Sequence, residues 1–310
     1  MTNDNSTLSF GEGRVRLLIT HIKTLVGTHP PGTKILRGQS MANLPTLDDA
    51  WLLIEQDIIQ DFGKMSDLNL AEIANDITEI HADGCFVFPS WCDSHTHLVF
   101  AASREEEFVL KIQGKSYEEI AAAGGGILNS ARKVQTSSEE ELYELAQKRL
   151  EEVIRMGTGA IEIKSGYGLS LESELKMLRV IRRLKGYAPI PIKATFLGAH
   201  TYPEQYKNDH QAYLDLLTHQ LLPQIADEGL ADYMDVFCER GFFSIDETSR
   251  LLDAGAKYGL KPKIHANQLS ASGAVEIGVK HQALSVDHLE MLDDHAVGAL
   301  ANSATIATLL

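Results

Sequence analysis

Apolar runs that each end in a cluster of polar residues recur along the second part of the chain, and amphipathic segments with a helical period separate them. The runs are FVFPSWCDSHTH (86–97), AIEIKSGYG (160–168), PIKATFLGAH (191–200), YMDVFCERG (233–241), KPKIHANQ (261–268), ALSVDHLE (283–290) and ATIATLL (304–310). Strands that alternate with helices predict a parallel sheet. So many units favour a (β/α)₈ TIM barrel over an open doubly wound sheet, because no glycine-rich phosphate-binding pattern follows the first strand.

The strand count stops at seven, in ATIATLL (304–310), whereas a closed (β/α)₈ barrel has about eight strands. Either the count is wrong by one, or the chain is a C-terminally shortened piece of a longer protein, and we expect the second. The first and last strands would then each lack a neighbour, and unpaired strand edges favour aggregation. We therefore expect the isolated polypeptide to be poorly soluble or molten, and hydrolytically inactive.

Residues 1–88 do not follow this alternation. VRLLIT (15–20) and AWLLIEQDIIQDFG (50–63) have the composition of short strands, and a stretch with glycine and proline separates them. The sequence therefore predicts two parts, a small β-rich N-terminal module over residues 1–88 and a barrel domain over residues 89–310.

The segment 137–157 is the clearest predicted helix. Ser137 and Glu140 have the spacing of a capping box, and Gly157 closes the segment. Its apolar residues fall on one stripe, so this helix is expected to pack one face against the sheet.

Composition limits the classes of function. The chain is 44% hydrophobic and 23% charged, an ordinary globular profile, and its formal net charge is -15. An acidic surface argues against non-specific binding to nucleic acid or to an anionic membrane, but not against a small acidic substrate held by one arginine. The three cysteines make no disulfide framework, and neither a signal peptide nor a membrane-spanning stretch is visible. These features predict a cytoplasmic protein.

The polar residues at the ends of the predicted strands are the candidate functional groups, because the carboxyl ends of barrel strands form the active-site face. His95 and His97 are one residue apart, so both point to the same side of a strand and can hold one metal ion. Further candidates are Glu162, Lys164, Tyr167, His200, Glu239, His265, Gln268 and His288. Each alone has a structural alternative: a buried histidine, an ion pair between Glu162 and Lys164, or a loop cap at Glu239. Together they predict a metal site.

Several of these motifs closely resemble the imidazolonepropionase family, which belongs to the amidohydrolase superfamily and acts in histidine degradation. They are DSHTHLVFAASREEEF, IEIKSGYGLSLESELKMLRVI, ATFLGAH, VFCERGFF, IHANQLS and VDHLE. The KSGYGL element is the specific one, whereas His-x-His alone is not. The resemblance implies a metal-dependent (β/α)₈ barrel with a small β-sandwich built from both chain termini, of which residues 1–88 would be the first part.

The resemblance also implies roles for single residues. His95, His97 and His265 would bind one divalent ion, Zn²⁺ or Fe, and the family's fourth ligand is an aspartate on an eighth strand, which this sequence does not reach. Arg104, Tyr167, His200 and Gln268 would contact the substrate. Some relatives carry Glu at position 268, and a glutamine there orients the substrate by hydrogen bonds but cannot carry a proton. His288 is the candidate hydrogen-bond donor or proton carrier.

The reaction implied by the resemblance is hydrolysis of 4-imidazolone-5-propanoate to N-formimidoyl-L-glutamate. Arg104 suits the propionate because a guanidinium binds a carboxylate in two places, although it could instead pair with Glu105, Glu106 or Glu107. Binuclear relatives use a carbamylated lysine on the fourth strand, but Lys164 is on the second, so we expect one metal. Another mononuclear amidohydrolase, such as a deaminase or N-acyl amino acid hydrolase, and a catalytically silent chain are the alternatives. The expected partner is a small molecule, and a homodimer is left open.

Overall fold

A computed structural model describes residues 16–56, 58–71, 73, 76–115 and 125–310. The chain divides into two compact units, Met1–Ser90 and Trp91–Leu310. The N-terminal residues 1–13, on which the absence of a signal peptide was argued, lie outside the described residues. Within the described part, no helix is both long enough and apolar enough to cross a membrane.

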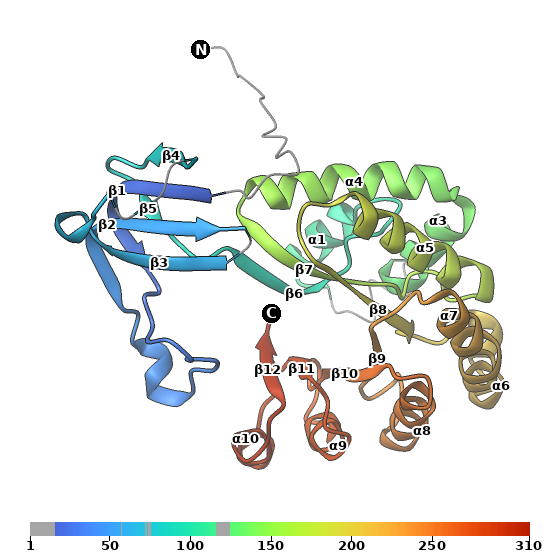
Figure 1. Cartoon of the computed structure of the whole chain (residues 1–310). Helices are drawn as coiled ribbons and strands as arrows, with labels where there is room; N and C mark the ends of the chain where they lie inside the picture. The colour runs from blue at the N-terminus through green and yellow to red at the C-terminus, as the bar shows by residue number, and fades with distance from the viewer. Residues whose placement is uncertain (1–15, 57, 72, 74–75, 116–124) are drawn as a thin grey trace. The chain divides into compact units, whose positions relative to one another are not determined.

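The first unit is a five-stranded sheet with two short 3₁₀ segments (Figure 1). Its elements are β1 (Arg16–Val26), η1 (Gly38–Ala42), β2 (Thr46–Glu55), β3 (Ile58–Lys64), η2 (Met65–Asp67), β4 (Thr78–His81) and β5 (Phe86–Val87). The strand order is β3-β2-β1-β4, with β5 also paired to β1. The β2 and β3 strands are antiparallel neighbours, and β4 and β5 run parallel to β1.

A bulge in β1 lets this strand contribute to small apolar clusters on both faces of the sheet. The register with β2 shifts between Ile19 and Ile22, and His21 between them has a φ of 55°. Before the bulge Leu18 packs with Trp51 and Leu53, and after it Ile22 packs in a separate cluster. An extra residue in one strand reverses which face the following side chains point to, and this accounts for the change of cluster.

The second unit is a parallel sheet of seven strands in consecutive order, β12-β11-β10-β9-β8-β7-β6. The strands are β6 (Trp91–Thr96), β7 (Thr158–Lys164), β8 (Ile192–Ala199), β9 (Tyr233–Cys238), β10 (Lys261–Ala266), β11 (Ser285–His288) and β12 (Ile306–Leu309). All seven coincide with the predicted runs. In the described structure β6 and β12 each pair with one strand only. That an eighth strand completes the sheet stays a prediction.

Helices alternate with these strands and pack around the curved sheet (Figure 1). They are α1 (Glu105–Ile112), α3 (Gly126–Thr136), α4 (Glu139–Arg155), α5 (Leu171–Tyr187), η3 (Glu204–Tyr206), α6 (His210–Asp215), the π-helical η4 (Leu216–Leu221), α7 (Leu222–Glu228), α8 (Ile245–Ala256), α9 (Ala274–Lys280) and α10 (Asp294–Ala301). Apolar faces of these helices and the strands form one large core. The alternation of strand and helix thus builds the predicted barrel-type wall.

The predicted capping box of the helix after residue 137 was wrong by one residue. Ser138 is the N-cap of α4: its hydroxyl accepts the Glu141 N–H at 3.1 Å, and the Glu141 carboxylate accepts the Ser138 N–H at 2.7 Å. Ser137 instead ends the preceding helix α3 as its C-cap. Both serines have a glutamate three residues later, so spacing alone does not separate them. Gly157 follows the end of α4 with a φ of 101°.

Candidate active site

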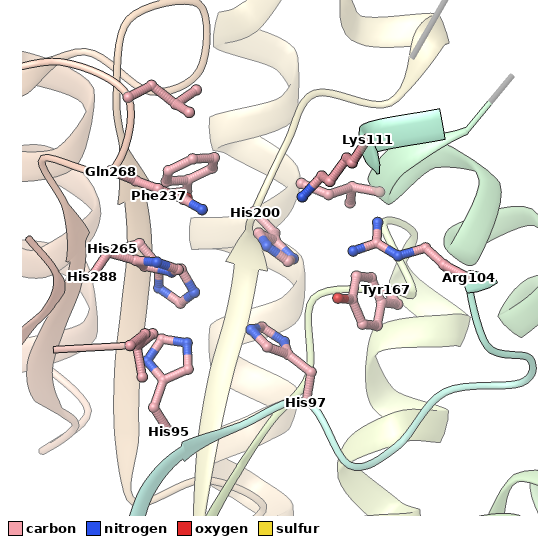
Figure 2. Close-up of a pocket in the computed structure, with 13 residues that line it drawn as sticks. His95, His97, Arg104, Lys111, Tyr167, His200, Phe237, His265, Gln268 and His288 are labelled. Carbon is pink, nitrogen blue, oxygen red and sulfur yellow. The ribbon is translucent and has the colours of Figure 1, made fainter. Parts of the chain in front are cut away.

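A cavity of about 360 Å³ opens at the carboxyl ends of the strands in the second unit (Figure 2). It is lined by His95, His97, Arg104, Lys111, Ile127, Tyr167, His200, Phe237, His265, Gln268, Leu269, His288 and Leu310. All eight residues that the sequence suggested as metal ligands, substrate contacts or proton carrier are among them. The fold therefore brings together residues spread over nearly two hundred positions of the chain.

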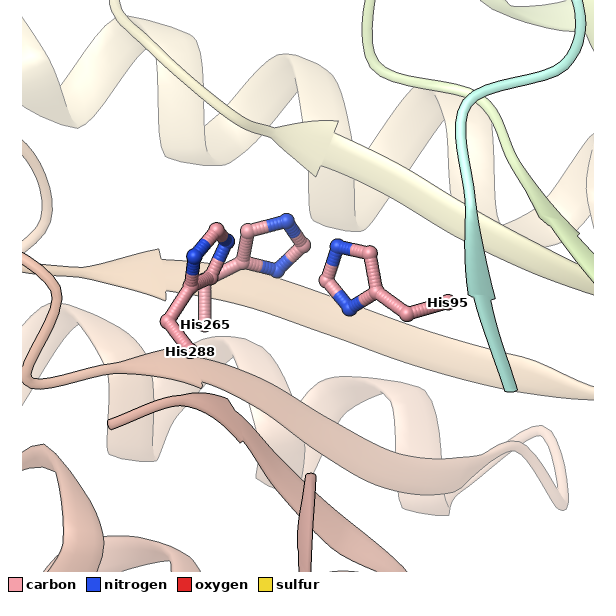
Figure 3. A group of neighbouring side chains, drawn as sticks. All are labelled: His95, His265 and His288. Carbon is pink, nitrogen blue, oxygen red and sulfur yellow. The ribbon is translucent and has the colours of Figure 1, made fainter. Parts of the chain in front are cut away.

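Histidine rings crowd one side of this cavity. The His95 ring centroid lies 4.5 Å from that of His265 and 5.4 Å from that of His97. His288 is 5.2 Å from His95 and 5.0 Å from His265, and Figure 3 shows these three rings converging. His200 stacks on His97 with centroids 5.1 Å apart. The five rings come from four different strands or the loops that follow them.

Two groups of three histidines each have one nitrogen per ring within 4.8 Å of one another, and His265 belongs to both. One group adds His95 and His288, and the other adds His97 and His200. The predicted ligands belong to different groups: His95 to the first, His97 to the second and His265 to both. The three rings lie close together, but the geometry does not distinguish them from His200 and His288 as the ligands.

His97, His200 and His265 are held in the neutral form that a metal requires. Burial lowers the pKa of His97 and of His265 well below the ordinary value, and neighbouring imidazoles lower that of His97 further. Burial also lowers the pKa of His200 to about 4. His97 Nδ1 and both ring nitrogens of His265 are buried without a hydrogen bond in the described residues, although His265 Nδ1 has the Asp235 carboxylate 2.9 Å away as an ion-pair neighbour. Unpartnered, unprotonated ring nitrogens are what a cation would satisfy, so this donor set fits a metal ion.

Two carboxylates contact ring nitrogens of these histidines, one at His95 and one at His265. Asp287 Oδ2 lies 2.7 Å from His95 Nδ1, and Asp235 Oδ2 lies 2.9 Å from His265 Nδ1. Both carboxylates are fully buried. A carboxylate at one ring nitrogen fixes the orientation and tautomer of a histidine whose other nitrogen binds a ligand.

The predicted ion pair between Glu162 and Lys164 is part of a larger buried network that does not line the cavity. Lys164 Nζ lies 2.6 Å from Glu162 Oε1 and 2.8 Å from Asp235 Oδ2. Lys263 contacts the second oxygen of Glu162 and lies 3.3 Å from Asp287. Burial alone would lower the pKa of Lys164, but the surrounding carboxylates raise it above the ordinary value. The lysine is thus a charged partner of acids.

Sequence reasoning missed Asp235, Lys263 and Asp287. A signal was present, because Asp235 and Lys263 precede the cavity residues Phe237 and His265 by two positions. Residues two apart on a strand face the same side. A charged residue two positions before a cavity residue on the same strand is therefore expected to face the barrel interior.

Tyr167 reaches the cavity from a loop whose backbone is hydrogen-bonded to the buried carboxylate of Glu174. Glu174 accepts backbone N–H groups from Gly166 at 3.1 Å, Gly168 at 2.7 Å and Leu169 at 2.9 Å. His200 Nδ1 lies 3.0 Å from the Gly166 carbonyl oxygen, so the same loop also orients this histidine. A side chain at position 168 would meet the Glu174 backbone nitrogen at 2.4 Å, so only glycine fits there.

Arg104 is both a cavity residue and a member of an ion pair. It forms the N-cap of α1, and its guanidinium lies 3.6 Å from the Glu107 carboxylate. Arg104 therefore pairs with a glutamate of this helix, which was the alternative to substrate binding in the sequence analysis. Its side chain also lines the cavity. Lys111, at the other end of α1, lines the cavity too and was not singled out from the sequence.

Glu239 does not line the cavity but holds the loop that carries Gln268. Its carboxylate accepts the backbone N–H of Leu269 at 2.9 Å and of Ser270 at 3.2 Å, and it also contacts the Ser270 hydroxyl. The loop-cap alternative considered for Glu239 is the role that the structure supports. Gln268 itself reaches the cavity wall (Figure 2).

The first unit holds another group of potential ligands, His21, His81 and Asp83, all exposed. Hydrogen bonding accounts for the position of His81, because its Nδ1 lies 3.2 Å from the Thr20 hydroxyl and 3.4 Å from His21 Nδ1. This group lacks the burial of the barrel histidines, and the carboxylate nearest to His81, that of Glu79, lies 3.9 Å away and is itself exposed.

Comparisons with known proteins give relatives over most of the chain, although no protein-family model matches it. The imidazolonepropionase of Christiangramia forsetii is 53% identical over 294 residues, which is 95% of this chain and 71% of the relative. That of Flavobacterium johnsoniae is 53% identical over 293 residues, 94% of this chain and 71% of the relative. The imidazolonepropionase of Shewanella piezotolerans is 46% identical over 263 residues, 84% of this chain and 64% of the relative.

Solved structures share the fold at low sequence identity. The 5-methylcytosine deaminase of Klebsiella pneumoniae superposes with a TM-score of 0.63 at 14% identity, covering 94% of this chain and 64% of its own. An atrazine chlorohydrolase variant from Arthrobacter aurescens TC1, solved with zinc and atraton, gives 0.60 at 14% identity, with 95% and 65% covered. A. niger ochratoxinase gives 0.61 at 12% identity, with 95% and 64% covered. These similarities confirm the predicted fold class.

Proposed function

The chain belongs to the imidazolonepropionase family, and on that premise we propose that its cavity binds 4-imidazolone-5-propanoate and hydrolyses the cyclic amide to N-formimidoyl-L-glutamate. The family is one of hydrolytic enzymes of histidine degradation. The observation that carries the proposal is that all eight residues suggested by the family's motifs line one cavity. The ligand is accordingly a small molecule that combines a planar ring with a carboxylate.

A metal ion is the cofactor of this site, and we propose Zn²⁺ or Fe²⁺ as its identity, with His95, His97 and His265 as ligands. Imidazole nitrogens suit both ions. Zinc is the ion bound in the atrazine chlorohydrolase of the same fold. Bound here, the ion would supply Lewis-acid activation of water near neutral pH. The unpartnered nitrogens of His97 and His265 support this assignment.

The remaining residues divide into substrate contacts and a proton carrier. Arg104 would hold the propionate carboxylate with charge-assisted hydrogen bonds. Tyr167 and His200 lie on the same side of the cavity with ring centroids 5.3 Å apart, where they would contact the ligand between its carboxylate and its ring. Gln268 would orient the imidazolone by donating and accepting hydrogen bonds.

His288 is proposed to move the proton. Its side chain lines the cavity and is 14% exposed, so it lies between the protein interior and solvent. Burial lowers its pKa below the ordinary value, and the resulting neutral imidazole can accept a proton during hydrolysis. Its ring points into the cavity (Figure 2), and its φ of 86° is unusual for a residue other than glycine; strained backbone of this kind is common at functional sites.

Ligand binding tests this proposal, with turnover as a second measurement. The zinc-loaded chain should bind 4-imidazolone-5-propanoate in calorimetry, and His265→Ala should abolish binding. His219→Ala, which removes a histidine that is 76% exposed, serves as the control. A parent chain that neither binds the imidazolone nor consumes it would contradict the proposed function.

A further inference from the structure

Among the residues that the structure describes, the charged side chains on the cavity wall are all positive. Arg104 and Lys111 line the cavity, and no carboxylate side chain of this described part does. A cationic cavity in a chain with a formal net charge of -15 indicates a site for an anion.

The two cations are not equivalent, because one has a carboxylate partner. The Arg104 guanidinium lies 3.6 Å from Glu107, whose side chain is 15% exposed. Glu107 is itself held in place, since its carboxylate accepts the Gly126 N–H at 2.9 Å. The Lys111 ammonium group has no ion pair or hydrogen bond within the described residues, and only the backbone carbonyl of Lys111 accepts hydrogen bonds, from Gln113 and Gly114. The pair of Arg104 and Glu107 is neutral overall, so the side chains that the structure describes on this wall carry one net positive charge, that of Lys111.

Helix geometry brings the two cations to one side of the cavity. Arg104 is the N-cap of α1 and Lys111 lies seven positions later, which is about two helical turns and therefore the same face. Figure 2 shows both side chains pointing into the cavity near Tyr167 and His200, on the side away from His288. An anionic group between them would leave the ring of the same ligand facing the histidines.

We infer that Lys111 is a second binding residue for the substrate carboxylate, in addition to Arg104. The planar guanidinium sets the orientation of the carboxylate, and the ammonium supplies the net charge that complements a monoanion. This inference rests on the proposed function, because it assigns the carboxylate end of the ligand to the α1 side of the cavity. Lys111 would thereby select a propanoate over a neutral side chain of the same size.

A pair of matched probes tests the inference on the zinc-loaded chain. The first is 3-(imidazol-4-yl)propanoate and the second is its neutral amide, which has nearly the same shape, and calorimetry measures the affinity for each. Lys111→Gln should weaken binding of the carboxylate about tenfold, as expected for a charge-assisted contact that is partly exposed, and leave binding of the amide unchanged. Lys111→Arg should retain most of the preference.

Two further variants sharpen the test. Lys148→Gln removes the same charge from an exposed position of α4 that does not line the cavity, and it should change neither affinity. Glu107→Gln keeps an acceptor for Gly126 but removes the compensating charge, so it should strengthen carboxylate binding several-fold. If Lys111→Gln keeps the parent's preference for the carboxylate, the inference is wrong and the proposed function stands. A parent chain with no such preference overturns the inference, and one that binds neither probe overturns both.

Discussion

His95 Nδ1 lies 2.7 Å from the carboxylate of Asp287, a residue 192 positions further along the chain. Their strands, β6 and β11, are not neighbours in the sheet, because β7 to β10 separate them. The contact therefore crosses the interior of the curved sheet. It leaves His95 Nε2 as the nitrogen available to a ligand, since Nδ1 is engaged by the acid.

Removing the charge of this acid should weaken metal binding without removing a ligand. Asp287→Asn keeps the shape of the side chain but can present its amide N–H₂ to His95 and so disturb the tautomer. We expect a loss of roughly 10–100-fold in zinc affinity, measured by competition with a chelator. Asp253→Asn is the control, because Asp253 is 67% exposed and lies 3.5 Å from His281 outside the cavity. Equal affinities for the parent and Asp287→Asn would exclude an orienting role.

Single alanine variants should resolve which histidines bind the ion. His265→Ala should abolish stoichiometric metal in either grouping, because His265 belongs to both. Loss of metal in both His95→Ala and His97→Ala, with retention in His200→Ala and His288→Ala, is expected for the proposed ligand set. Elemental analysis after dialysis measures the occupancy. Full occupancy in His97→Ala would instead favour the group of His95, His265 and His288.

The buried ion network should make Lys164 important for stability. Lys164→Met removes one of two lysines that neutralise three buried acids, and an uncompensated buried charge costs about 3–5 kcal/mol. Urea unfolding measures the change in the free energy of unfolding. The matched change Lys193→Met breaks an ion pair with Asp232 in which the lysine is 54% exposed, and it should cost less than about 1 kcal/mol. Similar losses for the two variants would argue against the network.

Glu174 should act on ligand binding through the loop that it fastens. In Glu174→Gln the amide can accept hydrogen bonds at one end only, so the Gly166 N–H or those of Gly168 and Leu169 lose their acceptor. We expect a loss of about 1–3 kcal/mol in the free energy of unfolding and weaker binding of the imidazolone, with the metal content unchanged. Glu172→Gln, on the exposed face of the same helix, is the control. Unchanged ligand affinity would restrict Glu174 to a structural role.

The carboxylate of Glu239 should add a pH-dependent increment to stability. Burial by itself would raise its pKa, but hydrogen bonds from the Ser270 hydroxyl and from backbone N–H groups lower it below the ordinary value of 4.5. An acid whose pKa is lower in the folded chain stabilises it above the unfolded value and loses that effect as the pH falls through the folded value. The stability difference between the parent and Glu239→Gln should therefore be constant near neutral pH and shrink below about pH 4.5.

Urea unfolding at a series of pH values measures this difference. Glu152→Gln, at an exposed position of α4, controls for the loss of one negative charge. A difference for Glu239→Gln that grows as the pH falls would have the wrong sign and would contradict the assignment.

The strands and the cavity residues were predictable because apolar runs mark buried strands, and a polar cluster that interrupts such a run marks its carboxyl end. His95, His97 and His265 are all found at such ends. The partners of these residues were not predictable in the same way. Asp287 and Lys263 meet Glu162 and His95 only because the sheet curves, and that curvature is a property of seven strands together.

Local features were mispredicted where two residues fit the same sequence pattern, or where the sequence carries no pattern at all. Ser137 and Ser138 both satisfy the capping-box spacing, and the choice depends on where α3 ends. In the sequence Lys111 cannot be told from any other lysine on a helix surface. Its position near Tyr167 and His200 results from the packing of α1 over the cavity, so it could be recognised only in the three-dimensional structure.

The opposite signs of the chain's net charge and of the cavity wall have a consequence for the speed of ligand capture. At distances beyond the cavity a carboxylate ligand meets the field of a chain with a formal net charge of -15, which repels it. Salt screens that field over a Debye length of about 8–10 Å, while the contacts with Arg104 and Lys111 act at much shorter range. Moderate salt should thus accelerate entry of the ligand even as it weakens the final complex. Association and dissociation then both become faster, and the site exchanges its ligand more rapidly.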